Sequence, residues 1–150
     1  ADTSKKETWK KMSDNGCMGV KIGIESGSQI VVDKIVNKHL DLKYAQEVVS
    51  HIRTLGMSVH GTFTYGLPGE TKEMLLETVK LNREIKPTST GVNIFYPYKG
   101  TPLGNRCFEE NLVNIEKYND FSNERRDSVL NYSEDWLKIL RYYIWRISNR

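Results

Sequence analysis

The stretch Gly61-Thr-Phe-Thr-Tyr-Gly-Leu-Pro-Gly-Glu-Thr71 predicts a short buried strand, a tight turn and the start of a helix. Aromatic residues alternate with threonines over positions 62–65, which is the two-residue period of a β-strand. Pro68 fixes φ at the second position of a turn, and Gly69 supplies the positive φ that a type II turn requires at the third. Thr71 can then cap the helix. Functional sites of parallel α/β folds lie at such strand ends, although a plain connecting loop explains the stretch equally well.

The rest of the chain predicts two more strands of the same kind and four helices around them. Strands are expected over residues 20–25, 59–65 and 91–96. In the last of these, Val92, Ile94 and Tyr96 face one way, and Asn93 and Phe95 face the other. Helices are expected after a capping box that begins at Ser4, after caps at Ser28 and Asp41, and over residues 72–86.

Beyond Leu103 the strand pattern disappears and a helical segment follows. A helix is expected over residues 106–118, a polar loop over residues 120–131, and a final helix after a cap at Ser133. One face of that final helix carries five large apolar or aromatic side chains. They are Trp136, Leu140, Tyr143, Ile144 and Ile147.

Strand, helix, strand, helix, strand with connections of this length predicts parallel strands joined by right-handed crossovers. Three parallel strands leave two open edges, and parallel sheets are normally covered on both faces. We therefore expect a fragment of a larger α/β layer or barrel, with about three parallel strands and a helical C-terminal segment.

Composition limits the partners. The chain has 150 residues, 38% of them hydrophobic and 27% charged, which describes one soluble domain. A net charge of +3, with basic and acidic residues interleaved, gives no argument for nucleic acid, and no apolar run is long enough for a membrane span. Cys17 and Cys107 lie far apart, which favours reduced thiols and a cytoplasmic location over a disulfide, and no clustered Cys or His pattern predicts a metal site.

Three stretches in series resemble the C-terminal half of a radical S-adenosylmethionine (radical SAM) barrel. They are Gly23–Ser28 followed by Asn37-Lys38, then Gly61–Thr71, and then Phe95–Thr101. The resemblance covers residues 1–103, implies a partial TIM-like (β/α)₆ barrel of which these would be the fourth to sixth strands, and leaves residues 104–150 as a helical C-terminal extension. It is strongest toward the cobalamin-dependent branch, which includes the anaerobic magnesium-protoporphyrin ester oxidative cyclase.

The resemblance also implies cofactors that this chain does not hold alone. The family binds S-adenosylmethionine and a [4Fe–4S] cluster on a CxxxCxxC loop, and its cobalamin-dependent members add cobalamin. No CxxxCxxC occurs here, and two cysteines cannot supply three ligands. The expectation is an inactive fragment of a parent oxidative cyclase, methyltransferase or methylthiotransferase, partnered by the rest of its own chain and by a small-molecule substrate.

Three of the implied cofactor-binding residues follow the first strand or the short helix after it. The resemblance places Glu25 against the ribose hydroxyls of S-adenosylmethionine, with Ser26 beside it, and Lys38 against the methionine carboxylate. A carboxylate suits a vicinal diol because it accepts two hydrogen bonds. The alternatives are a surface glutamate that caps a helix and a lysine that interacts with a helix C-terminus.

The other implied contacts come from the second and third strands. Thr62 occupies a position where some relatives place an aspartate toward the ribose. Tyr65 and Gly66 would border the adenine, and Tyr96 and Tyr98 could form a further wall. For the tyrosines, packing in the core explains the sequence equally well.

Two hypotheses from other classes remain open. One is a non-catalytic binding or assembly module that dimerises through the open sheet edges and the aromatic C-terminal helix. The other is an α/β enzyme that binds a small acyl or phosphate ligand at the Gly69-Glu70-Thr71 helix start, which offers one basic neighbour, Lys72.

Overall fold

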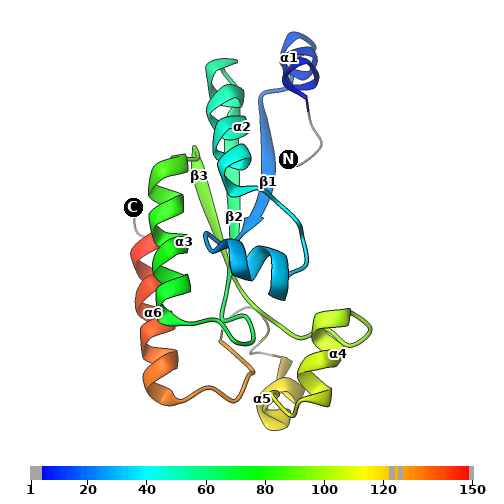
Figure 1. Cartoon of the computed structure of the whole chain (residues 1–150), viewed down its shortest axis with the longest axis vertical. Helices are drawn as coiled ribbons and strands as arrows, with labels where there is room; N and C mark the ends of the chain where they lie inside the picture. The colour runs from blue at the N-terminus through cyan, green and yellow to red at the C-terminus, as the bar shows by residue number, and fades with distance from the viewer. Residues whose placement is uncertain (1–4, 122–123, 125–126, 149–150) are drawn as a thin grey trace.

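The structure, a computed structural model, describes residues 5–121, 124 and 127–148. Three strands and the helices around them follow one another along the chain (Figure 1). In order they are α1 (Lys6–Asp14), β1 (Gly19–Glu25), the one-turn π-helix η1 (Val31–Ile35), α2 (Leu42–Thr54), β2 (Ser58–Tyr65), α3 (Lys72–Ile85), β3 (Ser89–Ile94), α4 (Pro102–Glu109), α5 (Ile115–Asn119) and α6 (Glu134–Ser148).

The three strands form one parallel sheet in the order β1-β2-β3, which confirms the predicted α/β topology. Ile22 pairs with Gly61 between the first two strands, and Phe63 pairs with Val92 between the second and third. The register shifts between Gly23 and Glu25, the last residue of β1. The sheet therefore ends with a local irregularity where the first strand meets its exit loop.

The two faces of this sheet differ in chemistry. Helices α2, α3 and α6 cover one face, where Ile24, Phe63 and Tyr65 join side chains of these helices in a common core. The other face carries Lys21, Gly23 and Glu25 from β1, and the small and polar residues that pair with them on the neighbouring strands. Those residues are Ser58, His60, Thr62, Thr64, Ser89, Gly91 and Asn93. In the described part of the chain no helix packs on this second face, which leaves it as a polar surface.

The connections to α2 and α3 follow the sequence closely. The side chain of Asp41 accepts hydrogen bonds from the backbone N–H groups of Lys43 and Tyr44, and that of Thr71 accepts one from Met74. The Glu70 N–H donates to the Leu67 carbonyl at 3.0 Å across the turn, and Gly69 has φ of +80°. These values confirm the predicted turn between β2 and α3 and the two predicted helix caps.

Two predictions about helix starts have other outcomes. Helical structure after β1 begins at Gln29, and the Ser28 carbonyl accepts from the Val32 N–H at 3.0 Å, but among the described bonds the Ser28 hydroxyl accepts none from the helix. The π-helical part η1 follows Ile30, which makes no side-chain capping bond. The capping box expected at Ser4 lies outside the described residues. The helix α1 begins after Lys5, again without a side-chain cap.

The single helix expected over residues 106–118 is wrong. The chain instead forms α4, which is capped by Thr101, and α5, which is capped by Asn114, and Asn111 between them has φ of +55°. Val113 pairs with Leu130 in an isolated antiparallel β-bridge, and both side chains are buried. The segment expected as a polar loop therefore contains a buried, β-bridged residue near its end. The physical reason is that Cys107, Val113 and Leu130 form a small second core, which a continuous helix could not bring together.

Helix α6 closes the molecule on the side of β3 and α3. Its Leu137 and Leu140 are buried in the main core, and Trp136, Tyr143 and Ile144 pack against it. The predicted apolar face is confirmed for these residues, while the side chain of Ile147 lies outside those described. None of the described helices combines the length and apolar character that a bilayer crossing would require.

Candidate functional site

The carboxylate of Glu25 lies at the carboxyl end of β1, held from two sides. Lys38 Nζ donates to its Oε1 at 3.0 Å, and Thr64 Oγ1 donates to its Oε2 at 2.8 Å. Its side chain is 25% exposed, so the oxygens are fixed but still reachable from solvent. Glu25 has φ of +71°, a left-handed conformation that is costly for a residue with a side chain. The strained backbone and the two bonds together aim this carboxylate across the end of the sheet.

Gly23 makes room for this arrangement. A Cβ atom at Gly23 would lie 2.6 Å from Glu25 Oε1 and 3.0 Å from Lys38 Nζ. The absent side chain also lets Lys38 Nζ donate to the Gly23 carbonyl at 2.8 Å. Lys38 is therefore committed to holding the glutamate and the strand end.

A pocket of about 710 Å³ opens beside Glu25 where the three strands end. Glu25 and Thr64 line it from β1 and β2, and Leu67 and Phe95 line it from the loops that follow β2 and β3. Lys34 from η1 and Arg106 from α4 add positive charge to the lining. The pocket thus offers one carboxylate, several apolar side chains including the aromatic ring of Phe95, and two cations. This combination suits a ligand with hydroxyl groups, a flat ring and a carboxylate.

Two predicted cofactor residues lie near this pocket but do not line it. Ser26 is buried, shares a hydrogen bond with Thr78 Oγ1 at 3.1 Å, and accepts one from the Ser28 N–H, so its hydroxyl ties β1 to α3. Thr62 lies on the uncovered face of the sheet but is buried between its neighbours, with its Oγ1 3.5 Å from the Ile22 carbonyl. Both hydroxyls are used within the protein.

Two more predicted residues, Tyr65 and Gly66, face the helices. Tyr65 is fully buried in the core beneath them. Gly66 has φ of +74°, and a Cβ atom there would lie 3.1 Å from Leu140 Cδ2 of α6. The side of Gly66 that a larger residue would occupy is thus already filled by the C-terminal helix.

The predicted tyrosine wall also lies apart from the pocket. The Tyr96 ring stacks on Tyr118 with centroids 5.1 Å apart, and its hydroxyl donates to the Tyr118 carbonyl at 3.1 Å. Tyr98 packs against Tyr96, and its hydroxyl is bonded to Glu124. The aromatic side chain that reaches the pocket from this segment is Phe95.

A second carboxylate, Glu70, is buried behind the loop between β2 and α3. Its Oε2 accepts hydrogen bonds from the N–H groups of Gly66 at 2.7 Å and Leu67 at 3.3 Å. Burial raises its pKa to about 7, although the two N–H donors act in the opposite direction. A carboxylate at this position, close to the start of α3, makes the helix start less favourable for a phosphate, which weakens the phosphate-ligand hypothesis.

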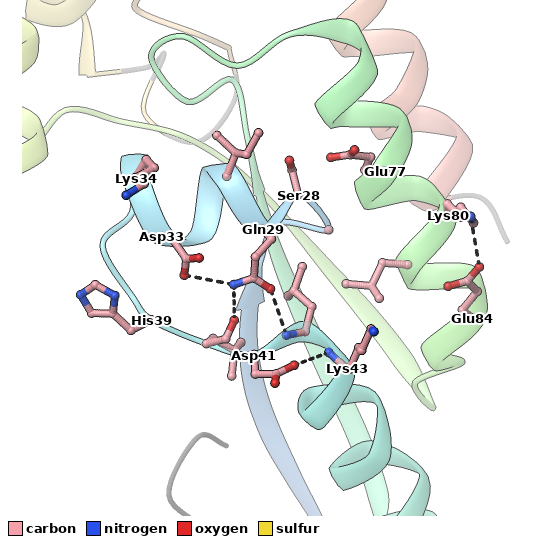
Figure 2. Close-up of a pocket in the computed structure, with 15 residues that line it drawn as sticks. Ser28, Gln29, Asp33, Lys34, His39, Asp41, Lys43, Glu77, Lys80 and Glu84 are labelled. Atoms are coloured by element: carbon pink, nitrogen blue, oxygen red, sulfur yellow. Dashed lines mark hydrogen bonds and ion pairs between the residues drawn. The ribbon is translucent and has the colours of Figure 1, made fainter.

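Another hollow, of about 980 Å³, lies on the outer side between η1, the start of α2 and α3 (Figure 2). Gln29 spans it, donating to Asp33 Oδ1 and to the Leu40 carbonyl and accepting from the Leu42 N–H. Its charged side chains are of both signs, and neither Glu25 nor Thr64 lines it. We therefore place the candidate site in the smaller pocket at the strand ends.

Of the residues that line that pocket, sequence reasoning predicted Glu25 alone as a site residue. Those it missed include Thr64, Leu67, Phe95 and Arg106. The strand period was a usable signal for two of them. Thr64 lies two residues after Thr62 on the uncovered face, and Phe95 was already placed on the face opposite Val92 and Ile94. Arg106 carries no such signal, because α4 reaches the pocket through a tertiary contact.

An iron–sulfur cluster does not fit the described residues. Within them, no three His, Cys, Asp or Glu side chains lie close enough together to hold a metal ion. Cys17 is a half-buried free thiol and Cys107 is a buried one, and burial raises the pKa of Cys107. The cysteine pattern CxxxCxxC is also absent from the sequence.

Comparisons with known proteins agree with this geometry. The model of the family described as the Radical SAM superfamily matches residues 1–81. Cytidylyl-2-hydroxyethylphosphonate methyltransferase from Streptomyces wedmorensis is 30% identical over 71% of this chain and 21% of its own length. Anaerobic magnesium-protoporphyrin IX monomethyl ester cyclase from Cereibacter sphaeroides is 26% identical over 94% of this chain and 25% of its own length.

A third relative and a solved structure extend the picture. The tRNA-2-methylthio-N(6)-dimethylallyladenosine synthase of Clostridium botulinum is 30% identical over 79% of this chain and 26% of its own length. The radical S-adenosylmethionine methyltransferase TsrM from Kitasatospora setae, solved with cobalamin and a [4Fe-4S] cluster bound, has a similar fold. Its TM-score is 0.62 at 22% identity, over 72% of this chain and 22% of that one.

This chain thus spans about a quarter or less of the length of each of these proteins. The matched family region contains β1, β2 and their crossover helix, and hence Glu25, Lys38 and Thr64. The sheet matches that of a radical SAM barrel in fold. Because the family model matches more than half of this chain, the chain belongs to the radical SAM superfamily.

Proposed function

We propose that this chain supplies part of the S-adenosylmethionine pocket of a parent radical SAM enzyme. The observation that carries the proposal is the Glu25 carboxylate, fixed by Lys38 and Thr64 at the edge of a pocket where three parallel strands end. Ligands of parallel α/β sheets bind outside the carboxyl ends of the strands. The pocket also has the mixed lining that a charged nucleoside requires.

Each part of the cofactor has a matching group in this pocket. Glu25 accepts hydrogen bonds from the two ribose hydroxyls, and each bond to a charged acceptor contributes about 1.5–3 kcal/mol. Leu67 and Phe95 pack against the adenine ring. Lys34 and Arg106 are the cations of the pocket lining that could bind the methionine carboxylate, since Lys38 pairs with Glu25. Arg106 Nε also donates to Glu110 at 2.8 Å, so the carboxylate would take the other guanidinium N–H groups of Arg106.

The remaining chemistry belongs to other parts of the parent. A [4Fe–4S] cluster, held by residues outside this sequence, would supply the reducing electron, since no CxxxCxxC occurs here. We therefore propose that this chain alone is inactive, that it acts in the cytoplasm, and that the parent is an oxidative cyclase, methyltransferase or methylthiotransferase. The relatives carry those names, and the cobalamin in TsrM makes cobalamin a further proposed cofactor.

The uncovered polar face of the sheet indicates where the rest of the parent lies. Gly91 would place a Cβ atom 2.7 Å from His60 Nε2, so His60 lies across the sheet surface in space left by a glycine. A face of this polarity suits an enclosed chamber for a small-molecule substrate better than a packed layer of helices. In isolation, the same face and the edges of β1 and β3 could pair two copies of the chain, which is the dimer of the assembly hypothesis.

Binding of S-adenosylmethionine to the full-length parent, measured by isothermal titration calorimetry, tests the proposal. Glu25→Ala should abolish measurable binding. Glu47→Ala should leave it unchanged, because Glu47 is an exposed residue of α2 that does not line the pocket. Equal affinity of wild type and Glu25→Ala would contradict the proposed role. A concentration-independent dimer that binds no S-adenosylmethionine would favour the assembly module instead.

A further inference from the structure

The loop that joins β2 to α3 is held by partners distant in sequence. Leu67 of this loop lines the strand-end pocket, and Gly66 precedes it. The hydroxyl of Tyr132 donates to the Leu67 carbonyl at 2.5 Å and lies 3.3 Å from the Gly66 carbonyl. Sixty-five residues of chain separate Tyr132 from Leu67. The contact therefore couples the pocket wall to the C-terminal segment.

The backbone N–H groups of the same two residues, Gly66 and Leu67, are bound by Glu70. Its Oε2 accepts from the N–H groups of Gly66 and Leu67, so the donors and the acceptors of both residues are engaged by protein side chains. Glu70 is only 6% exposed, which removes water as a substitute partner. A buried loop in which the N–H and carbonyl groups of Gly66 and Leu67 are all engaged has one preferred conformation.

Packing fixes the back of the loop as well. A Cβ atom added at Gly66 would lie only 3.1 Å from Cδ2 of Leu140 in α6. Tyr132 itself is anchored by an edge-on contact with Trp136, with ring centroids 5.8 Å apart, and its ring packs against both hydrophobic cores. The C-terminal segment thus contacts the loop twice, through the Tyr132 hydrogen bond and through the apolar side chain of Leu140.

The same segment reaches the pocket from its other side. Helix α4 contributes Arg106 to the lining, together with the cap residue Thr101 and the first residues of the helix. Residues on both sides of position 103 therefore surround one cavity. None of these contacts involves Glu25, so they are independent of the evidence used for the proposed function.

We infer that the segment after residue 103 completes the cofactor pocket, and that Tyr132 is a positioning residue that holds the Gly66–Leu67 loop against the ligand. Tyr132 acts on S-adenosylmethionine only through the loop backbone, which it keeps in the conformation that presents Leu67 to the pocket. This inference rests on the proposed function for the identity of the ligand. The bracing of the loop itself does not depend on it.

The test compares Tyr132→Phe with Tyr118→Phe in the full-length protein. Both variants remove one hydroxyl from the C-terminal segment, but Tyr118 makes its contacts here through its ring and its carbonyl. Tyr132→Phe should weaken S-adenosylmethionine binding about three- to tenfold, the range for one net hydrogen bond. It should also speed hydrogen exchange of the Gly66 and Leu67 amides, while amides in the core of α2 exchange as in wild type.

A second variant, Glu70→Gln, keeps the side-chain shape but weakens the acceptor, and should speed exchange of the same two amides. If wild type binds S-adenosylmethionine and Tyr132→Phe binds it equally well with unchanged loop exchange, the inference is overturned. If wild type does not bind S-adenosylmethionine, the proposed function fails. In that case, faster loop exchange in both variants would still support the brace, and unchanged exchange would overturn it.

Discussion

Glu25 and Glu70 both follow strands of the same sheet, yet they occupy opposite environments. Glu25 lies at the pocket with a quarter of its side chain exposed, and both its oxygens have partners that leave one side open. Glu70 is buried, binds backbone N–H groups, and has an Oε1 without a hydrogen-bond partner. The same side-chain type thus serves as a proposed ligand group at one strand end and as a structural support after the next.

Burial explains the shifted pKa of Glu70. Glu70 is desolvated, which raises its pKa to about 7. Burial, and to a smaller extent the charge of Glu70, raises the pKa values of the nearby Tyr65 and Tyr132 hydroxyls. No charged side chain neutralises Glu70 among its described contacts, whereas Lys38 pairs with Glu25. An ionised carboxylate is a strong hydrogen-bond acceptor for the two hydroxyls of a ribose diol.

The largest expected effect separates the two glutamates by the same substitution. Glu25→Gln should weaken S-adenosylmethionine binding roughly 100-fold, because it removes the charge that strengthens two hydrogen bonds. Glu70→Gln should weaken binding much less, since Glu70 touches only the loop backbone. Calorimetric titration of both variants measures the difference in affinity. Equal losses of affinity would contradict the proposal that Glu25 contacts the ligand and Glu70 does not.

The next effect concerns the space around Glu25. Gly23→Ala would place a methyl group 2.6 Å from Glu25 Oε1, so the carboxylate and Lys38 must move. We expect about tenfold weaker binding of S-adenosylmethionine, on the scale of one lost charged hydrogen bond. Gly91→Ala is the matched control on the same face, because its methyl group would displace His60 instead. Similar binding by both variants would contradict the role of Gly23.

A smaller effect is expected at Thr64, which donates to the other oxygen of Glu25. Thr64→Val keeps the shape of the side chain and removes the donor, and should weaken binding about three- to tenfold. Thr90→Val, which removes a hydroxyl that bonds to Asn82 on the helix-covered face, should leave binding unchanged. A Thr64→Val protein with wild-type affinity would show that Lys38 alone fixes the carboxylate.

The smallest effect is on stability and concerns Glu70. Its pKa is raised from 4.5 to about 7, so the folded state holds a proton that the unfolded state has released between these values. The free energy of unfolding should therefore fall as pH rises from about 5 to 7, by on the order of 2 kcal/mol relative to Glu70→Gln. Urea titrations of both proteins at several pH values measure this slope. Identical slopes would mean that Glu70 is less desolvated than the structure indicates.

Local patterns in the sequence were sufficient for the sheet, and the family resemblance was sufficient to single out Glu25, which lines the strand-end pocket. Alternation and crossover length predicted three parallel strands, and Glu25 followed from the resemblance of Gly23–Ser28 to the family. The caps at Asp41 and Thr71 were predictable because capping involves residues two or three apart. These features depend on short stretches of chain.

The features that were missed depend on contacts between distant residues. The bridge between Val113 and Leu130 breaks what reads as one helix, because burying these side chains outweighs local helix propensity. The wall of the pocket contains Phe95 and not Tyr96, since Tyr96 stacks on Tyr118 of α5. No local pattern in the sequence indicates that Val113 pairs with Leu130 or that Tyr96 stacks on Tyr118.

Hydrogen exchange of the full-length protein, with and without S-adenosylmethionine, tests the central claim most directly. Our account predicts slower exchange where the pocket is lined, around Glu25, over Thr64–Leu67 and at Phe95. It predicts no change at Gln29 and Asp41, which line the outer hollow of Figure 2. Protection confined to the outer hollow, or none at the strand ends despite binding, would contradict the assignment of the cofactor site.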